Sequence, residues 1–218
     1  MSGLLMKDLE LIKINMKTYL AVFLIGLIYL VAHENGSTFF VAYATFVSIG
    51  VSVGTISYDG YHHGMRFLMT LPITKEQYVQ SKYLLSFCFA VLVSAASLLL
   101  GIIRIQISGN QKVEDLLIST GVALVISGII LCGMIPLRLK YEAEKSRIVM
   151  VAVVAVIFLV AAACKKLYDV YQKSFGKSLQ FLNTLSGWQI AVGLIVVMMI
   201  CLAVSVKVSE RIMEKKEF

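Results

Sequence analysis

Long runs of apolar residues dominate this sequence, and they restrict what the chain can fold into more than any other feature. A helix needs about 20 mostly apolar residues to cross the hydrocarbon core of a bilayer. Six runs come close to that length: Met16–Ala32, Phe39–Ser57, Tyr83–Ile103, Leu116–Ile135, Ile148–Cys164 and Trp188–Val206. Of the 218 residues, 59% are hydrophobic and 15% charged, more apolar surface than a soluble core of that size could bury. We therefore predict an all-α integral membrane protein, a single transmembrane domain over 1–218 with six transmembrane helices.

Lysine and arginine gather in alternate loops, which sets the expected orientation. The arm before the first span, the loops after the second and fourth spans, and the tail hold fourteen of these residues; the other loops hold six. Because cytoplasmic loops usually carry the excess, both termini are predicted to be cytoplasmic. Four of the six lie in the outer loop 165–187, expected to be either a plain loop or a lid over an exit path. The net charge of +7 suits anionic membrane lipids as partners and requires no nucleic acid.

Residues 2–17, before the first span, have the pattern of an amphipathic helix. Leu5, Leu9, Ile12 and Met16 follow the spacing of one helical face, and the charged residues fall mostly elsewhere on the helical wheel. Such a helix is expected to lie in the membrane interface. The alternative is that this segment simply extends the first span into the cytosol.

The loop 58–82 is the longest predicted cytoplasmic connection, and it contains a signal for the start of a helix. Thr74 and Gln77 have the spacing of a capping box, and Pro72 discourages any helix before it. A short helix is therefore predicted to start at about Lys75 and to run toward the third span; the alternative is a simple connector. Both prolines of the chain lie outside the predicted spans, so the spans are expected to be straight.

No catalytic, cofactor-binding or metal-ligating set is recognisable in the sequence. The segment Gly176-Lys177-Ser178 lacks the first glycine of a phosphate-binding loop. His62 and His63 would point about 100° apart on a helix, so they are expected to be solvated side chains rather than a metal site. The predicted span interiors contain no Asp, Glu, Lys, Arg or His, residues that ion-coupled transporters keep within the membrane. A transporter built from this chain would therefore take its energy from another subunit and would suit an amphipathic or apolar substrate.

Several short motifs are similar to those of a known family. They are Leu5-Met6-Lys7-Asp8-Leu9, Ser57-Tyr58-Asp59, Leu71-Pro72-Ile73-Thr74, Tyr78-Val79-x-x-Lys82-Tyr83, and Pro136-Leu137-x-x-Lys140-Tyr141 with Glu144-Lys145-x-Arg147. On these residues the chain resembles the small six-span permeases of the ABC-2 type, and among them the phenol-soluble modulin exporter permease group. Many such permeases have an acidic residue after the aspartate equivalent to Asp59, where this chain has Gly60.

The resemblance implies roles for particular segments. Residues 2–17 would be an N-terminal amphipathic elbow helix on the inner leaflet, and about 74–81 would be a coupling helix that docks into a separate ABC ATPase subunit. Five residues would touch the ATPase and two would set the helix start: Lys75, Glu76, Tyr78, Val79 and Lys82, with Pro72 and Thr74. The loop after the fourth span would make a secondary contact through Lys140, Glu144 and Arg147.

The resemblance also implies a function for the whole chain. We expect the membrane-spanning permease subunit of an ATP-driven ABC exporter in a bacterial cytoplasmic membrane, exporting amphipathic or antimicrobial-type peptides. ATP and Mg would bind the partner ATPase, so this chain would not be an enzyme, and a second permease copy or a paralogue would complete the path. The alternative is a non-transporting membrane assembly or peptide-immunity factor. A neighbouring gene for an ATPase with Walker motifs would separate the two.

Overall fold

The computed structural model describes residues 2–33, 36–60, 64–70, 72–108, 112–141 and 187–216. The fifth predicted span, Ile148–Cys164, all of the outer loop before Gly187, and the pair His62 and His63 lie outside the described residues. Seven helices are described: α1 (Ser2–Ile14), α2 (Met16–Ala32), α3 (Gly36–Gly60), α4 (Gly64–Thr70), α5 (Lys75–Ser108), α6 (Val113–Lys140) and α9 (Gly187–Glu214). The described part of the chain has no strand, which confirms the prediction of an all-α protein.

Within these ranges, four helices are long and apolar enough to cross a membrane. They lie in α3, α5, α6 and α9, and α1 with α2 forms a fifth candidate that is bent by 66°. Helix α2 has the bounds predicted for the first span. Large apolar side chains on its surface are exposed, among them Ile25 and Ile28 at 62% and 67%, as expected for contact with lipid. A membrane protein with several spans is therefore confirmed, and the count of six stays a prediction.

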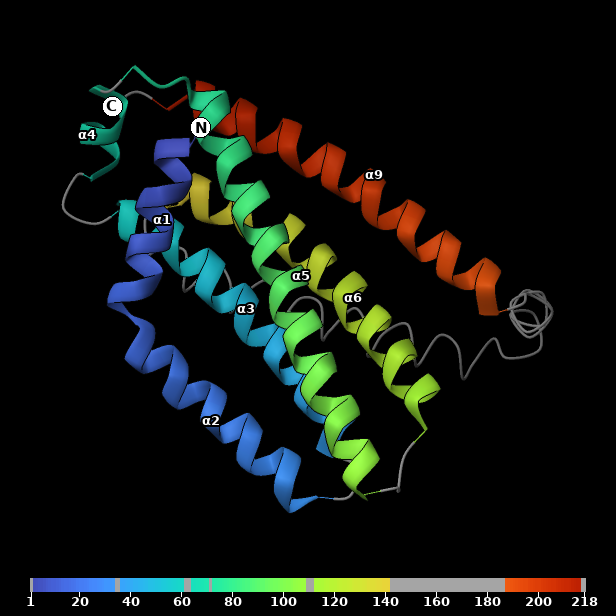
Figure 1. Cartoon of the computed structure of the whole chain (residues 1–218). Coiled ribbons are helices and arrows are strands. Elements are labelled where there is room, and N and C mark those ends of the chain that lie inside the picture. The colour runs from blue at the N-terminus through green and yellow to red at the C-terminus, as the bar shows by residue number, and fades with distance from the viewer. Residues whose placement is uncertain are drawn as a thin grey trace, which may run out of the picture.

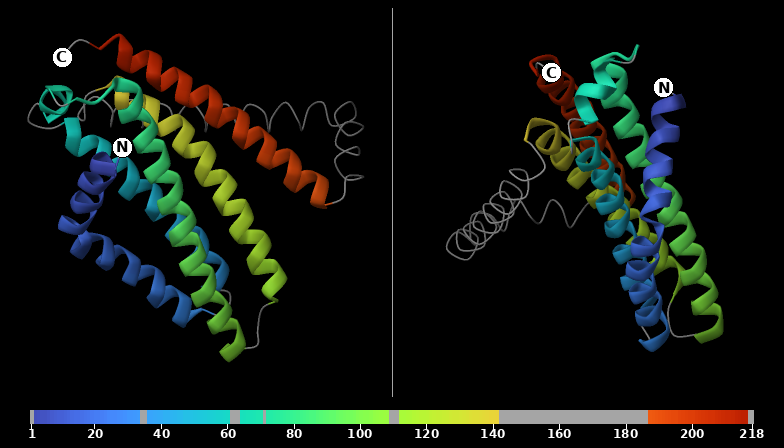
Figure 2. Two further views of the ribbon diagram at one scale, coloured as in Figure 1. Left: turned by 45° about the horizontal axis from the view of Figure 1, so that its top comes forward. Right: turned by 90° about the vertical axis from the view of Figure 1, so that its left-hand side faces the viewer.

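Helix α3 is the centre of the bundle. It packs against α5 and α6, α9 packs against α6 and α5, and α2 covers another side of α3 (Figure 1). The start of α1, the end of α9 and helix α4 all lie at one end of the molecule, and the α2–α3 and α5–α6 connections lie at the other (Figures 1 and 2). The charge distribution predicts that both termini share one side of the membrane, and both lie at one end of this structure (Figure 1). That this side is cytoplasmic stays a prediction.

Two prolines behave differently from the prediction. Pro136 lies inside α6, which continues to Lys140 rather than ending near residue 135. A proline cannot donate a hydrogen bond to the carbonyl four residues earlier, here that of Cys132. The Ser205 hydroxyl of α9 donates to this carbonyl instead, so the helix continues without leaving it unpaired. Pro72 is predicted to discourage any helix before it. Helix α4 nevertheless precedes it and ends at Thr70, two residues earlier. This is possible because a proline restricts mainly the one residue that precedes it.

Helix α1 is present, and one side of it packs against the bundle. Leu4 and Asp8 are buried, at 5% and 0% exposure, whereas Leu9 is 50% exposed and Met16 is 53% exposed. Leu9 and Met16, which belong to the predicted apolar face, therefore point away from the bundle, and the charged Asp8 points into it. The bend between α1 and α2 falls at Asn15, whose side-chain amide donates to the Leu11 carbonyl. An elbow helix that lies on the inner leaflet stays a prediction.

Candidate functional site

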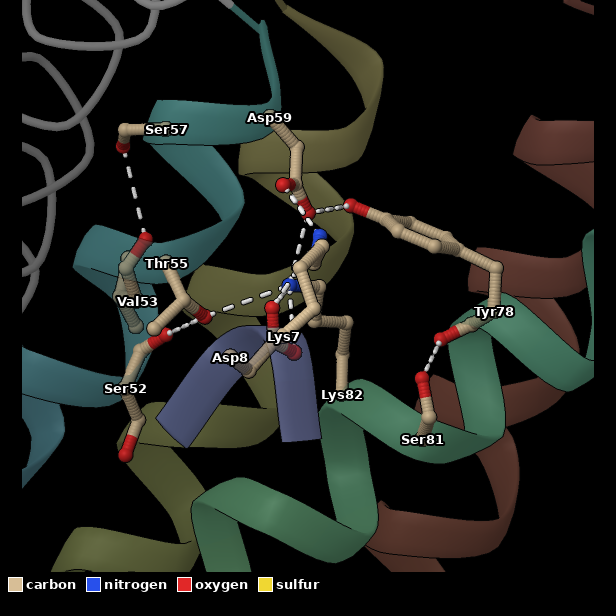
Figure 3. Close-up of polar contacts among 10 residues, drawn as sticks. All are labelled: Lys7, Asp8, Ser52, Val53, Thr55, Ser57, Asp59, Tyr78, Ser81 and Lys82. Carbon is tan, nitrogen blue, oxygen red and sulfur yellow. Dashed lines mark hydrogen bonds and ion pairs between the residues drawn. The ribbon is translucent and has the colours of Figure 1, made fainter. Parts of the chain in front are cut away.

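At the end of the bundle that holds both termini, four charged residues from three helices form a ring of alternating sign (Figure 3). The Lys82 ammonium of α5 lies 2.7 Å from both carboxylate oxygens of Asp8 and 2.7 Å from a carboxylate oxygen of Asp59. The Lys7 ammonium donates to the other Asp59 oxygen and lies 3.2 Å from Asp8. Each cation therefore contacts both carboxylates, and α1 supplies one residue of each sign.

The ring is shielded from solvent on most sides. The side chains of Asp8 and Lys82 are each 1% exposed and that of Asp59 is 5% exposed, whereas that of Lys7 is 30% exposed. The Tyr78 hydroxyl donates to Asp59 over 2.9 Å, and its ring centroid lies 5.3 Å from the Lys82 ammonium. The charges balance, and each carboxylate accepts at least two hydrogen bonds or ion pairs. These are the conditions under which buried charges are tolerated.

Sequence analysis missed this ring, although a signal for it was present. Asp59 and Lys82 lie just outside predicted spans, and Lys7 and Asp8 lie in the arm before the first span, so the sequence pattern places all four outside the packed part of the chain. In the structure α3 extends to Gly60 and α5 begins at Lys75, which brings Asp59 and Lys82 inside the helical bundle. Asp59 follows the end of one apolar run and Lys82 precedes the start of the next, and this arrangement could have indicated an ion pair. The inward-facing Asp8 would then have been its third member.

The helix start predicted from the capping box is confirmed. The backbone N–H of Gln77 donates to the Thr74 hydroxyl over 3.2 Å, and the backbone N–H of Thr74 donates to the side-chain oxygen of Gln77 over 3.4 Å. The helix that begins at Lys75 is not a separate short one, because it continues without a break to Ser108. The segment 74–81 is therefore the first two turns of a candidate membrane span.

The structure divides the residues predicted to touch an ATPase into two groups. Tyr78 and Val79 are 0% exposed and Lys82 is 1% exposed, so their side chains are internal in this structure. Contact of these three residues with an ATPase stays a prediction. Sequence spacing placed them on the right helix but could not show that this face of the helix packs inside the bundle.

The other residues of the set lie at or near the surface. Pro72, Thr74 and Glu76 are exposed. The Lys75 ammonium donates to the Glu214 and Lys216 carbonyls, at 3.1 and 2.7 Å, and so caps the end of α9. The exposed members of the set therefore form a short surface at the start of α5.

The predicted secondary contact is only partly within the described chain. Lys140 is exposed at the end of α6, and its ammonium lies 5.3 Å from the Tyr141 ring. Glu144 and Arg147 lie outside the described residues. The structure thus brings Lys140 to the same end of the bundle as α4 and the start of α5 (Figure 1).

Helix α4 borders a cavity of about 630 Å³ next to the charged ring. Its walls are mainly apolar and its lining includes Lys7 and Asp59 from the ring. Further lining residues come from α1, α4 and the α4–α5 connection, among them Leu4, Leu11, Phe67, Leu68, Pro72 and Ile73. Phe67 itself is 69% exposed, so α4 presents an aromatic side chain to the outside of the bundle. The described residues contain no group of three or more side chains that could hold a metal ion.

A comparison with protein families decides what kind of protein this is. The model of the ABC-2 family transporter proteins matches residues 3–214, which include the charged ring and all the described helices apart from Ser2, the first residue of α1. The chain belongs to the ABC-2 transporter family. No curated protein and no solved structure matches it. Proteins of the ABC-2 family are the membrane components of transporters, not themselves catalytic, and work with an ABC ATPase subunit. The narrower resemblance to the phenol-soluble modulin exporter group stays a prediction.

Proposed function

We propose that this ABC-2 protein is the permease subunit of an ATP-driven exporter, and that the ATPase docks at the end of the bundle that carries α4. The observation that carries this proposal is the surface formed there by α4 and the capped start of α5. Phe67 is 69% exposed on α4, and Glu76 is exposed one residue into α5. Exposed aromatic residues next to charged ones are typical of the centre and rim of protein interfaces.

The position of this surface suits the transfer of movement. The start of α5 is stabilised by its capping box, and the same helix continues through the bundle as a candidate span. A partner that pushes on Glu76 would therefore move a helix that reaches the opposite end of the molecule. The ends of α3, α6 and α9 lie at the same end of the bundle, where Lys140 would offer a second contact (Figure 1).

The proposed substrate is an amphipathic peptide, of the antimicrobial type. Support comes from a second cavity, of about 330 Å³, between α5, α6 and α9. Its lining is apolar apart from Ser127 and includes Phe87, Leu124, Leu131 and Met198. Such a surface favours apolar groups and offers no charge to a small ion. A second permease copy or a paralogue would complete the path, in the cytoplasmic membrane of a bacterium.

Purification of the tagged chain from native membranes in mild detergent tests the proposal. We expect an ATPase with Walker motifs to co-purify, and the double change Phe67→Asp with Glu76→Lys to reduce its recovery by about tenfold or more. Glu114→Lys is the matched control, because Glu114 is an exposed acidic residue at the start of α6, at the other end of the bundle. Recovery of the chain alone, under conditions that preserve known ABC complexes, would instead favour a non-transporting assembly or peptide-immunity factor.

A further inference from the structure

The ring of four charges determines which way α1 can face. Lys7 and Asp8 are adjacent, so their side chains leave the helix about 100° apart. In the structure Asp8 faces Lys82 of α5 and Lys7 faces Asp59 of α3. Rotating α1 by one residue in either direction would break this pairing of opposite charges. The ring therefore selects one rotational position of α1 on the bundle.

Buried ion pairs are better suited to selecting a geometry than to adding stability. The cost of removing such charges from water commonly cancels their attraction, and well-packed apolar residues of similar size are often as stabilising. A polar ring in a position that apolar side chains could fill thus indicates a requirement for a defined arrangement. The ring joins helices that are far apart in sequence, since Lys82 follows Asp8 by 74 residues.

Among the described residues, the other contacts of α1 with the bundle are mainly apolar, apart from the hydrogen bond that Tyr58 donates to Asn15 just after its end. Leu4 is the one buried apolar residue of α1 among those whose burial is described, and Met6 and Ile14 are 69% and 76% exposed. Apolar contact alone is not directional and would allow α1 to rotate about its own axis. The directional contacts from α1 to the other helices near this point come from Lys7 and Asp8 (Figure 3).

The ring also touches the part of α5 that leads to the proposed ATPase surface. Tyr78 lies one helical turn before Lys82 and donates to Asp59, so α5 contacts the ring at two successive turns. The capped Thr74 is one turn further toward the surface. A displacement of the start of α5 would therefore displace Lys82 and Tyr78 together.

We propose that Lys7, Asp8, Asp59 and Lys82 are positioning residues that make α1 move with the start of α5. Through the bend at Asn15 this movement would reach α2, a helix with no residue in the ring. The role in transport rests on the proposed function, whereas the fixed rotation of α1 does not. The two can therefore be tested separately.

The variants exchange charges without altering composition. Lys7→Asp with Asp8→Lys reverses the α1 side of the ring, and Asp59→Lys with Lys82→Asp reverses the other side; each double variant places like charges in contact. The quadruple variant restores an alternating ring with every sign reversed. All variants keep the same net charge, so only the pattern of contacts differs between them.

The reporter is a single cysteine introduced by Leu4→Cys, at a position that is buried when α1 is docked. The four native cysteines, Cys88, Cys132, Cys164 and Cys201, are replaced by alanine, and a water-soluble maleimide labels the protein in open membrane fragments. We expect each double variant to label at least about tenfold faster than the parent, since release of the ring exposes position 4. The quadruple variant should return to within about threefold of the parent. Glu10→Cys, at an exposed position of the same helix, is the control and should label equally in all of them.

Equal labelling of the parent and both double variants would overturn the proposal. If neither double variant accumulates in membranes, the quadruple variant decides: its recovery supports the ring as the determinant of the α1 position, and its loss contradicts it.

With the ATPase bound, the α1 double variant should hydrolyse ATP without exporting peptide, and the quadruple variant should export again. Export by a variant whose reporter cysteine labels fast would remove the coupling role. Absence of any bound ATPase would count against the proposed function alone.

Discussion

The ammonium of Lys82 contacts both carboxylate oxygens of Asp8 at 2.7 Å, and both side chains are almost completely buried. One residue comes from the arm before the first span and the other from the start of a candidate membrane helix. The contact thus ties the beginning of the chain to the part of the molecule that we propose faces an ATPase.

Replacing Lys82 with methionine should strongly destabilise the protein. The change preserves much of the side-chain volume but removes the buried one of the two cations that Asp8 and Asp59 share. Breaking a buried pair in this way costs about 3–5 kcal/mol. Unfolding in mixed detergent measures the loss. Lys13→Met is the control: it removes an exposed pair with Glu10 and should cost at most about 1 kcal/mol. Equal effects from the two changes would contradict the buried ring.

Tyr78→Phe isolates one hydrogen bond of the ring. The hydroxyl of Tyr78 donates to a charged acceptor over 2.9 Å in a buried setting, so its removal should cost about 1.5–3 kcal/mol in unfolding experiments. Tyr58→Phe removes a hydroxyl that donates to Asn15 in an exposed setting and should cost less. A larger effect at Tyr58 would argue against the assigned partners. Tyr78→Ala would create a cavity as well, so a loss of transport in that variant would not by itself identify an ATPase contact.

Sequence reasoning predicted those features that depend on local chemistry. The apolar runs predicted the membrane helices, and the spacing of Thr74 and Gln77 located the start of α5. The distribution of lysine and arginine predicted that both termini share one side, and they lie at one end of the bundle (Figure 1). Each of these signals is a property of the sequence of individual segments and loops, so no knowledge of the packing was needed.

Sequence reasoning could not predict the contacts between segments. Tyr78 and Lys82 fall on an apparently accessible helix, and only the packing of α1 and α3 against α5 shows that they are internal. Likewise, α6 continues through Pro136 because a hydroxyl from α9 satisfies the carbonyl that proline leaves unpaired. The apolar spacing in residues 2–17 could not show that Asp8 faces the bundle, because its partner Lys82 lies 74 residues away in the sequence.

Lys75→Gln should loosen the C-terminal end of α9. Its ammonium donates to the carbonyls of Glu214 and Lys216, groups that otherwise lack a partner within the helix. We expect faster proteolysis of the tail after residue 211, with a loss of about 0.3–1 kcal/mol in local stability. Lys207→Gln, an exposed change on the same helix, should leave the cleavage rate unaltered. Identical digestion of the two variants would show that Lys75 does not cap α9.

Gly36→Ala should disturb the α2–α3 connection. A Cβ atom at Gly36 would lie 2.8 Å from the Cα and carbonyl oxygen of Leu30 and from the carbonyl oxygen of Tyr29, backbone atoms that cannot move aside easily. We expect a loss of about 1–3 kcal/mol in unfolding experiments. Gly121→Ala meets no atom within 4 Å and should be neutral or slightly stabilising. A neutral Gly36→Ala would contradict the close approach of α2 and α3.

ATP-dependent transport in reconstituted vesicles tests the central claim most directly. The complex of this chain and its co-purified ATPase is placed in liposomes, and a fluorescent amphipathic helical peptide is added on the side where the ATPase is exposed. We predict accumulation of peptide inside the vesicles with ATP and Mg, none with a non-hydrolysable analogue, and none with a complex carrying Lys7→Asp and Asp8→Lys. Steady ATP hydrolysis by the intact complex without any peptide movement would contradict a role in peptide export.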